Sequence, residues 1–256
     1  MLNNMADYTI SETYTLPSRG LIYDTPIDPV IKLRSMTTRE EMKRLARTDT
    51  PYKVMCEIIE DCIVGEKPAI RVYDMCLGDY QYLLHKLRVV TYGPDYRMKV
   101  ACPNCGQLFD AVINLDDLEV MEYTDDIEEL KKVTLPVSKK EITLRIQTPR
   151  ILDSISAKTK DMKKKQKDAS SEELGLLATL EYIIGKVDGE VLNPAKMETF
   201  IKGMPMRDVN VLIQAAGKLN GKVGIDSSVI CTCTECNYDV ASSFRITSEF
   251  FGPTID

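Results

Sequence analysis

The sequence lacks tryptophan and has a single histidine, His85, among 256 residues. Histidine is the side chain whose ordinary pKa lies nearest neutrality, and it is a common metal ligand. One histidine therefore argues against histidine-based acid–base catalysis and against a metal centre built from several histidines. His85 has no serine, cysteine or aspartate partner at motif spacing, so we expect a satisfied or solvated histidine on a helix.

Long hydrophobic runs are also missing. No stretch approaches the roughly 20 apolar residues that a membrane-spanning helix needs, and the N-terminal segment lacks the basic and apolar regions of a signal peptide. We therefore expect synthesis in a reducing cytoplasm, where cysteines are thiols or metal ligands more often than disulfides. Acidic residues (39) outnumber basic residues (33), giving a net charge of −6, which suits protein partners better than nucleic acid.

Catalytic motifs are absent as well. The sequence contains no glycine-rich phosphate loop, no nucleophile elbow, no H-E-x-x-H motif and no kinase-like set. Each of these would supply a reactive group or a cradle for phosphate. Their absence predicts that the protein is not an enzyme and has no small-molecule substrate.

The sequence does have eight cysteines, and four of them form two C-x-x-C knuckles, Cys102-Pro-Asn-Cys105 and Cys233-Thr-Glu-Cys236. Zinc favours four soft ligands in a tetrahedral arrangement, and two such turns can present four thiolates to one ion. Four protein ligands leave no open coordination position, so the ion would be structural rather than catalytic. The pattern predicts one Zn²⁺ bound by these four cysteines, whose binding stabilises the fold.

The residues after the two knuckles repeat as well. Gly106 and Asn237 directly follow the second cysteine of each pair, where the backbone often needs a left-handed conformation. Because residues 106–232 separate the cysteine pairs, we expect a zinc-ribbon-like module that is split by an inserted subdomain. Both sequences also place apolar residues four, eight and ten positions after the second cysteine, as in a turn followed by a strand: Phe109, Ile113 and Leu115, and Val240, Phe244 and Ile246.

Other interpretations of the cysteines stay open. The knuckles would also fit a degenerate site without metal, a thiol redox pair or an iron cluster, although the strand–motif–helix setting of thioredoxin is absent. Cys231 lies two residues before Cys233 and is an alternative ligand, with a less usual spacing to Cys236. The remaining three lie in or beside apolar helical faces, where we expect them to pack in the core: Cys56, Cys62 and Cys76.

Periodicity and capping residues divide the chain into extended and helical segments. Thr37 followed by Glu40 is a capping-box pattern at a helix start, and Gly93 ends a later helix. Further helices are expected at these positions: after Pro51, near Asp79, after Pro149, over SEELGLLATLEYIIG, and after Asn193-Pro194 and Met204-Pro205. Two hairpins are expected around the turns Ser138-Lys139-Lys140 and Asp188-Gly189.

These elements predict an α+β protein with a helical block, a split zinc-ribbon-like β module, a helical insertion and an extended N-terminal arm. An extended arm can add a strand to a partner's sheet, and a helical block can dock on another subunit. The expected division is 1–35 for the arm, 36–95 for the helical block, 96–148 for the first half of the β module with a hairpin, 149–221 for the helical insertion, and 222–256 for the second half of the module.

Two charged clusters carry weaker signals. Six lysines lie between Lys158 and Lys167 and can contact phosphates, but a solvated helix end or linker is the simpler interpretation. The second cluster is acidic and consists of Asp125, Asp126, Glu128 and Glu129. No matching group of carboxylates lies elsewhere in the sequence, so we do not expect this cluster to bind a metal ion.

Several segments occur in an informative order: LPSRGLIY (16–23), LRSMTTREE (33–41), DYQYLLHKLRVVTYG (79–93) and CPNCG (102–106). A later segment, MPMRDVNVLIQAAGKLNGKVGID, precedes the second C-x-x-C. In this order and at these distances, the sequence resembles the baseplate hub assembly proteins of T-even-like tailed phages and their relatives. Cys231 departs from that pattern, and residues 150–200 carry no motif of the family.

The resemblance implies a bacteriophage protein of the tail, acting as a structural or assembly component of the baseplate hub. It implies binding to other baseplate and tail subunits, a place in the virion after assembly in the host cytoplasm, and no catalytic role. The main alternative is a zinc-ribbon protein that binds nucleic acid or associates with transcription, based on the ribbon and the lysine run. A thiol redox protein that uses one C-x-x-C is a third hypothesis.

Overall fold

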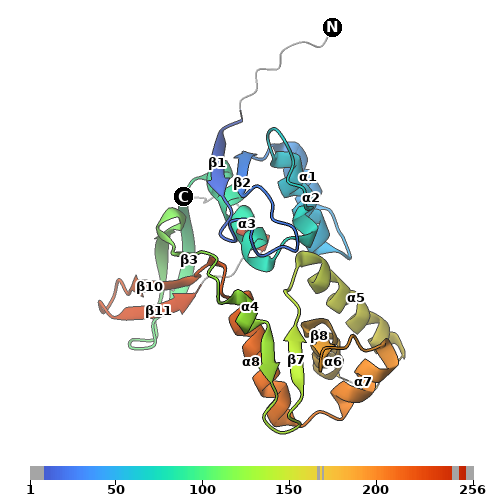
Figure 1. Ribbon diagram of the computed structural model, residues 1–256. Coiled ribbons are helices and arrows are strands. Elements are labelled where there is room, and N and C mark those ends of the chain that lie inside the picture. Colours follow the sequence, from blue (N-terminus) through green and yellow to red (C-terminus); the bar gives the residue numbers. More distant parts are fainter. Residues whose placement is uncertain (1–8, 166–167, 169, 244–247, 252–256) are drawn as a thin grey trace.

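Helices and small antiparallel sheets alternate along the chain (Figure 1). The computed structural model describes residues 9–165, 168, 170–243 and 248–251. Within these residues, the sheets have two or three strands, and every strand pair is antiparallel. This mixture confirms the predicted α+β class. No helix in these ranges is both long enough and apolar enough to cross a membrane.

The described part of the N-terminal segment contains two extended strands, as predicted. Strand β1 (Ser11–Thr15) pairs with β2 (Val30–Arg34), and β2 buries Ile31 and Leu33 from alternate positions. Leu16 is 1% exposed in the core beneath them. Within the described residues, the two strands pair with each other, and the alternate apolar side chains of β2 pack on this chain's own helices.

Three helices follow, α1 (Thr38–Leu45), α2 (Pro51–Cys62) and α3 (Leu77–Tyr92). The capping box at the start of α1 is confirmed: the Arg39 N–H donates to Thr37 Oγ1 at 3.3 Å, and the Thr37 N–H donates to a carboxylate oxygen of Glu40 at 2.8 Å. Pro51 occupies the first turn of α2, also as predicted. Helix α3 begins two residues before Asp79 and ends at Gly93.

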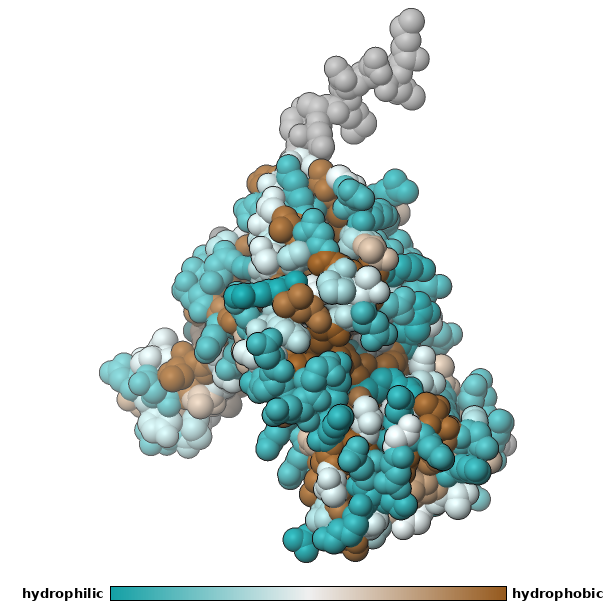
Figure 2. Space-filling model, in the orientation of Figure 1, coloured by the Kyte–Doolittle hydropathy of each residue, from teal (hydrophilic) through white to brown (hydrophobic). Residues whose placement is uncertain are grey.

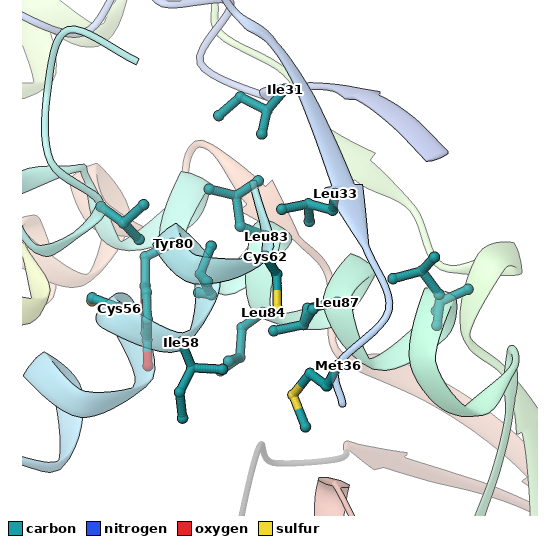
Figure 3. Packing of buried hydrophobic residues seen from close by; sticks show 14 of the residues in the cluster. Ile31, Leu33, Met36, Cys56, Ile58, Cys62, Tyr80, Leu83, Leu84 and Leu87 are labelled. Carbon is teal, nitrogen blue, oxygen red and sulfur yellow. The ribbon is translucent and has the colours of Figure 1, made fainter. Parts of the chain in front are cut away.

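The first hydrophobic core lies between these strands and helices. Figure 3 shows Leu33 of β2, Cys62 of α2 and Leu83 of α3 pointing toward one another. All three are fully buried. Truncating one such side chain typically costs about 2–5 kcal/mol, so this packing fixes the position of α3, from which the chain continues into the first knuckle.

The second core lies under a three-stranded sheet of order β6-β7-β8. Strands β6 (Lys132–Thr134) and β7 (Glu141–Leu144) form the hairpin predicted around Ser138-Lys139-Lys140. The Asp188-Gly189 turn is present with left-handed backbone at both residues, and an isolated bridge joins Val187 to Glu190. However, β8 (Ile184–Val187) makes its ladder with β7, because its buried side chains face the second core rather than a local partner.

Helices α6 (Ser171–Ile183), α7 (Pro194–Lys202) and α8 (Met206–Asn220) contribute buried side chains to this core, and α5 (Pro149–Lys165) packs between α6 and α2. The predicted starts after Pro149, Asn193-Pro194 and Met204-Pro205 are confirmed. The short elements of the described chain are α4 (Ile127–Leu130), β5 (Val120–Met121) paired with β9 (Gly224–Ile225), and the 3-10 turns Val72–Asp74, Leu115–Asp117 and Ser248–Phe251.

A buried carboxylate fastens the first group of helices to the second. Asp153 of α5 is 3% exposed. It accepts hydrogen bonds from the N–H groups of Tyr52 (3.4 Å) and Lys53 (2.9 Å) in the first turn of α2, and from the Tyr73 hydroxyl at 3.0 Å. A negative charge at a helix N-terminus satisfies donors that have no partner within the helix. This contact therefore connects two parts of the chain that lie far apart in sequence.

Candidate metal centre

The first knuckle is a turn between two paired strands, β3 (Asp95–Ala101) and β4 (Leu108–Asn114). The Cys102 N–H donates to the Gln107 carbonyl at 2.9 Å, and the Gly106 N–H donates to the Cys102 carbonyl at 2.9 Å. Gly106 has a φ of 75°, a left-handed conformation that glycine adopts without strain. The turn therefore aims both sulfurs to the same side.

The second knuckle repeats this arrangement between β10 (Ser228–Thr232) and β11 (Asp239–Ser243). The Cys233 N–H donates to the Tyr238 carbonyl at 2.9 Å, and the Asn237 N–H donates to the Cys233 carbonyl at 3.0 Å. Asn237 has a φ of 55°. The left-handed backbone predicted after each second cysteine is thus present in both turns.

The two turns bring the four sulfur atoms together. All four Sγ atoms lie within 4.8 Å of one another, with Cys102–Cys236 at 3.6 Å and Cys105–Cys233 at 3.7 Å. Zinc–sulfur bonds of about 2.3 Å in a tetrahedron place sulfur atoms about 3.8 Å apart. The thiols are therefore spaced to hold one metal ion. Among the described residues, these four cysteines are the group of metal-ligating side chains whose ligand atoms lie close enough together to do so.

Without a metal ion, the thiols of Cys236 and Cys105 do not ionise alike. The Asn104 amide donates to Cys236 Sγ at 3.5 Å and, with the Tyr238 N–H, lowers the pKa of this thiol to about 7. At Cys105, the Gln107 N–H favours the thiolate, but desolvation by the neighbouring groups and hydrogen bonds to the other thiols raise the pKa to about 12. A bound cation would remove this difference in ionisation, because it deprotonates every thiol that coordinates it.

Cys231 belongs to the core of the module and lies outside the sulfur cluster. It pairs with Val240 across β10 and β11, just as Val100 pairs with Phe109 across β3 and β4. Cys231 and Val100 each precede their first knuckle cysteine by two residues, and both are buried. The predicted apolar positions Phe109, Ile113, Leu115 and Val240 are also buried, whereas Phe244 and Ile246 fall outside the described residues.

The other cysteines and the histidine lie inside the protein. Cys56, Cys62 and Cys76 are buried as expected, and burial raises the pKa of each thiol, that of Cys62 to about 12. His85 is 1% exposed, and its Nε2 lies 2.9 Å from the Leu115 carbonyl oxygen. Burial lowers the pKa of His85 to about 4, so the ring is neutral at physiological pH.

The lysine run contacts this chain's own carboxylates. Lys158 pairs with Glu181, and Lys160 pairs with Asp49 at 3.0 Å. Lys167 lies outside the described residues. In the acidic cluster, Asp126 pairs with Lys222, Glu128 pairs with Lys131, and no group of described residues there meets the geometry of a metal site.

A buried aspartate explains why two sequence motifs occur together. Asp79 of α3 accepts hydrogen bonds from the Ser18 N–H (3.0 Å), from the Ser18 hydroxyl (2.5 Å) and from the Tyr23 hydroxyl (2.5 Å). LPSRGLIY thus packs its serine and tyrosine on the first residue of DYQYLL. Sequence reasoning did not assign this role; the only signal was the order of the motifs.

A buried arginine was also missed. Arg88 of α3 is 1% exposed and donates to the carbonyl oxygens of Phe250 (2.9 Å), Gly93 (2.7 Å) and Asp95 (3.1 Å). It thereby joins the end of α3 to the start of β3 and to the C-terminal turn. Burial lowers the pKa of this guanidinium, but the carbonyl oxygens offset the cost of burying it.

Comparison with known families decides the identity. A family model described as "T4 bacteriophage base plate protein" matches residues 8–252. The chain belongs to this family. No curated protein and no solved structure matches the chain.

Membership of a phage baseplate family supports a structural role in the baseplate. A baseplate is built from many protein subunits, so the family implies contacts with other phage structural proteins, and it indicates a role without catalysis. The resemblance stated from the motif order is confirmed at the level of the baseplate family.

Proposed function

We propose that the protein is a structural or assembly component of the baseplate hub, acting through protein–protein contacts and held in shape by one structural zinc ion. The family match over residues 8–252 carries this proposal. The hub is proposed because the motif order resembles hub assembly proteins. The protein would be assembled in the host cytoplasm and remain in the tail.

The chemistry of the sulfur cluster supports zinc as the metal. Four cysteines and no histidine or carboxylate form the group, and four thiolates suit Zn²⁺ in a closed, structural site. Cys102 and Cys233 are almost fully buried, while Cys105 is exposed, so an ion could enter from the side of Cys105. Bound there, zinc would hold the β3–β4 and β10–β11 hairpins together.

The surroundings of the titratable groups support a role without catalysis. His85, Asp79, Asp153 and Arg88 are buried and use their polar atoms to join segments of the chain. A catalytic acid or base must instead reach a substrate. The nucleic-acid alternative gains no specific support, since Lys158 and Lys160 pair with carboxylates.

The proposal is tested by deleting the gene in the phage and supplying it in trans. We expect the deletion to abolish baseplate and tail assembly, and the wild-type gene to restore both. Mass spectrometry of purified virions then distinguishes a retained hub component, which is detected, from an assembly factor, which is absent. Complete tails in the deletion mutant, with the protein absent from wild-type virions, would overturn the proposed function.

A further inference from the structure

The β3–β4 and β10–β11 hairpins together form the metal module, and they border a groove that lies outside the sulfur cluster. Its volume is about 550 Å³, and five consecutive residues from each of two strands line it, 110–114 of β4 and 228–232 of β10. In the described chain, β4 pairs only with β3, and β10 only with β11. Each strand therefore keeps one edge whose backbone groups make no ladder hydrogen bonds, and such an edge can pair with an added strand.

Apolar side chains beside the groove are unusually exposed. Val112 of β4 is 61% exposed and Ile230 of β10 is 77% exposed, and both line the groove. Leu108, four residues before Val112 on the same face of β4, is 70% exposed. Figure 2 shows the projecting lobe of β10 and β11, at the left, with hydrophobic residues among hydrophilic ones. Apolar side chains gathered beside a groove indicate a contact surface.

The charges at the groove have one sign. Four carboxylates line it, and no lysine or arginine does: Asp110, Asp117, Glu119 and Asp226. Lys99 stands opposite Asp110 in the β3–β4 register, yet no ion pair within the described chain neutralises any of the four. They do not converge on one point closely enough to hold a metal ion. Carboxylates repel phosphates, so a nucleic-acid strand does not fit this groove.

We propose that the β4–β10 groove binds an extended segment of another protein subunit that presents both basic and apolar side chains on one face. Successive side chains of a strand point to opposite faces. Asp110 and Val112 are two residues apart and share the exposed face of β4. One face of such a segment can therefore place apolar side chains against Val112 and Ile230 and a basic side chain near Asp110, while its backbone pairs with an open strand edge. Only the identity of the partner as a phage subunit rests on the proposed function.

The test uses the full-length, metal-loaded protein and a fluorescent, end-blocked decapeptide in which lysine and valine alternate at every second position, with serine between them. Anisotropy should show binding that weakens as salt rises. The double variant Asp110→Asn, Glu119→Gln and the single variant Ile230→Ser should each bind at least tenfold more weakly. The matched control, Glu172→Gln with Glu190→Gln, removes the same charge from exposed positions elsewhere and should bind like the wild type. Metal content and thermal unfolding verify that each variant folds.

Three outcomes would overturn the proposal. The first is no binding of the lysine peptide, or equal binding of the same peptide with glutamate in place of lysine. The second is an equal loss of binding in the control variant, which would indicate general charge attraction. The third is a dimer in sedimentation experiments that the groove variants dissociate, because the groove would then hold a second copy of this chain. Each result can occur while gene deletion still abolishes tails, so the proposed function is tested separately.

Discussion

At the scale of single residues, Cys231 and Cys233 have different roles although only one residue separates them. Cys231 occupies the inward position that Val100 fills in the other hairpin, whereas Cys233 Sγ lies 3.7 Å from Cys105 Sγ. We predict that Cys231→Val keeps one metal ion per chain, with its free energy of unfolding within about 1.5 kcal/mol of the wild type. Cys233→Ser should lose the metal ion and much of its stability. Elemental analysis and thermal unfolding measure both.

The reverse pattern, in which the Cys231 variant loses the metal and the Cys233 variant retains it, would assign the fourth ligand to Cys231. Sequence spacing alone left this choice open. The pairing across β10 and β11 favours Cys233, because the side chain of Cys231 points into the core of the metal module with Val240 and Phe109.

His85 offers a second test at this scale, because it is the only histidine in the chain. Burial lowers its pKa from 6.5 to about 4. As pH falls from 6.5 to 4, the unfolded state binds a proton at His85 that the folded state does not bind. The neutral, buried His85 therefore contributes fully to the stability of the folded state above pH 6.5, and this contribution declines toward pH 4. NMR should show one imidazole titrating near pH 4 in the folded protein.

His85→Gln provides the control, since it should remove this part of the pH dependence of unfolding and leave the part due to carboxylates. A titration midpoint near 6.5 in the folded wild type would show that the ring is solvated, contrary to its burial in the structure.

At the scale of elements, the features encoded by neighbouring residues were predictable from the sequence. The Thr37–Glu40 cap and the left-handed residues Gly106 and Asn237 depend on hydrogen bonds within a few positions. Pairings that depend on distant segments were not predictable. Strand β8 joins β7 rather than forming a ladder across the adjacent Asp188-Gly189 turn, because burial against the second core outweighs the local hairpin signal.

A close approach between α3 and β9 yields an element-scale prediction. A Cβ atom added at Gly78 would lie 2.1 Å from the Val223 carbonyl oxygen, whereas one added at Gly217 of α8 would meet nothing within 4 Å. Gly78→Ala should therefore destabilise the protein by at least about 2 kcal/mol, since backbone must move. Gly217→Ala should stabilise it by about 0.5–1 kcal/mol through helix propensity.

Chemical denaturation measures the change in the free energy of unfolding for both variants. We expect a decrease for Gly78→Ala and an increase for Gly217→Ala. Equal effects would mean that α3 and β9 do not approach as closely as described. No sequence pattern marked Gly78 beforehand, because its restriction comes from residues that are far away along the chain.

At the scale of the whole molecule, the metal module is assembled from two segments that lie far apart in the sequence. The β3–β4 and β10–β11 hairpins meet through their sulfur atoms, and the second core is formed largely by the chain between them. The four cysteines could be predicted because each C-x-x-C is a local motif. The groove between the hairpins could not, because it exists only where β4 and β10 come together.

The division of the sequence into five segments stays a prediction, although its extended, helical and knuckle elements are present in the described residues. Closing a long loop costs entropy that grows only slowly with its length, so a metal ion that joins the two knuckles can offset the cost of a large insertion. This explains how one module can tolerate a complete helical subdomain between its halves.

The metal content of the native protein tests the central claim most directly. We predict one zinc ion per chain by elemental mass spectrometry of protein purified without added metal or chelator. A strong chelator should remove it, lower the unfolding temperature and release four thiols together: those of Cys102, Cys105, Cys233 and Cys236. Carefully prepared protein that contains no metal, and whose stability a chelator leaves unchanged, would contradict the account.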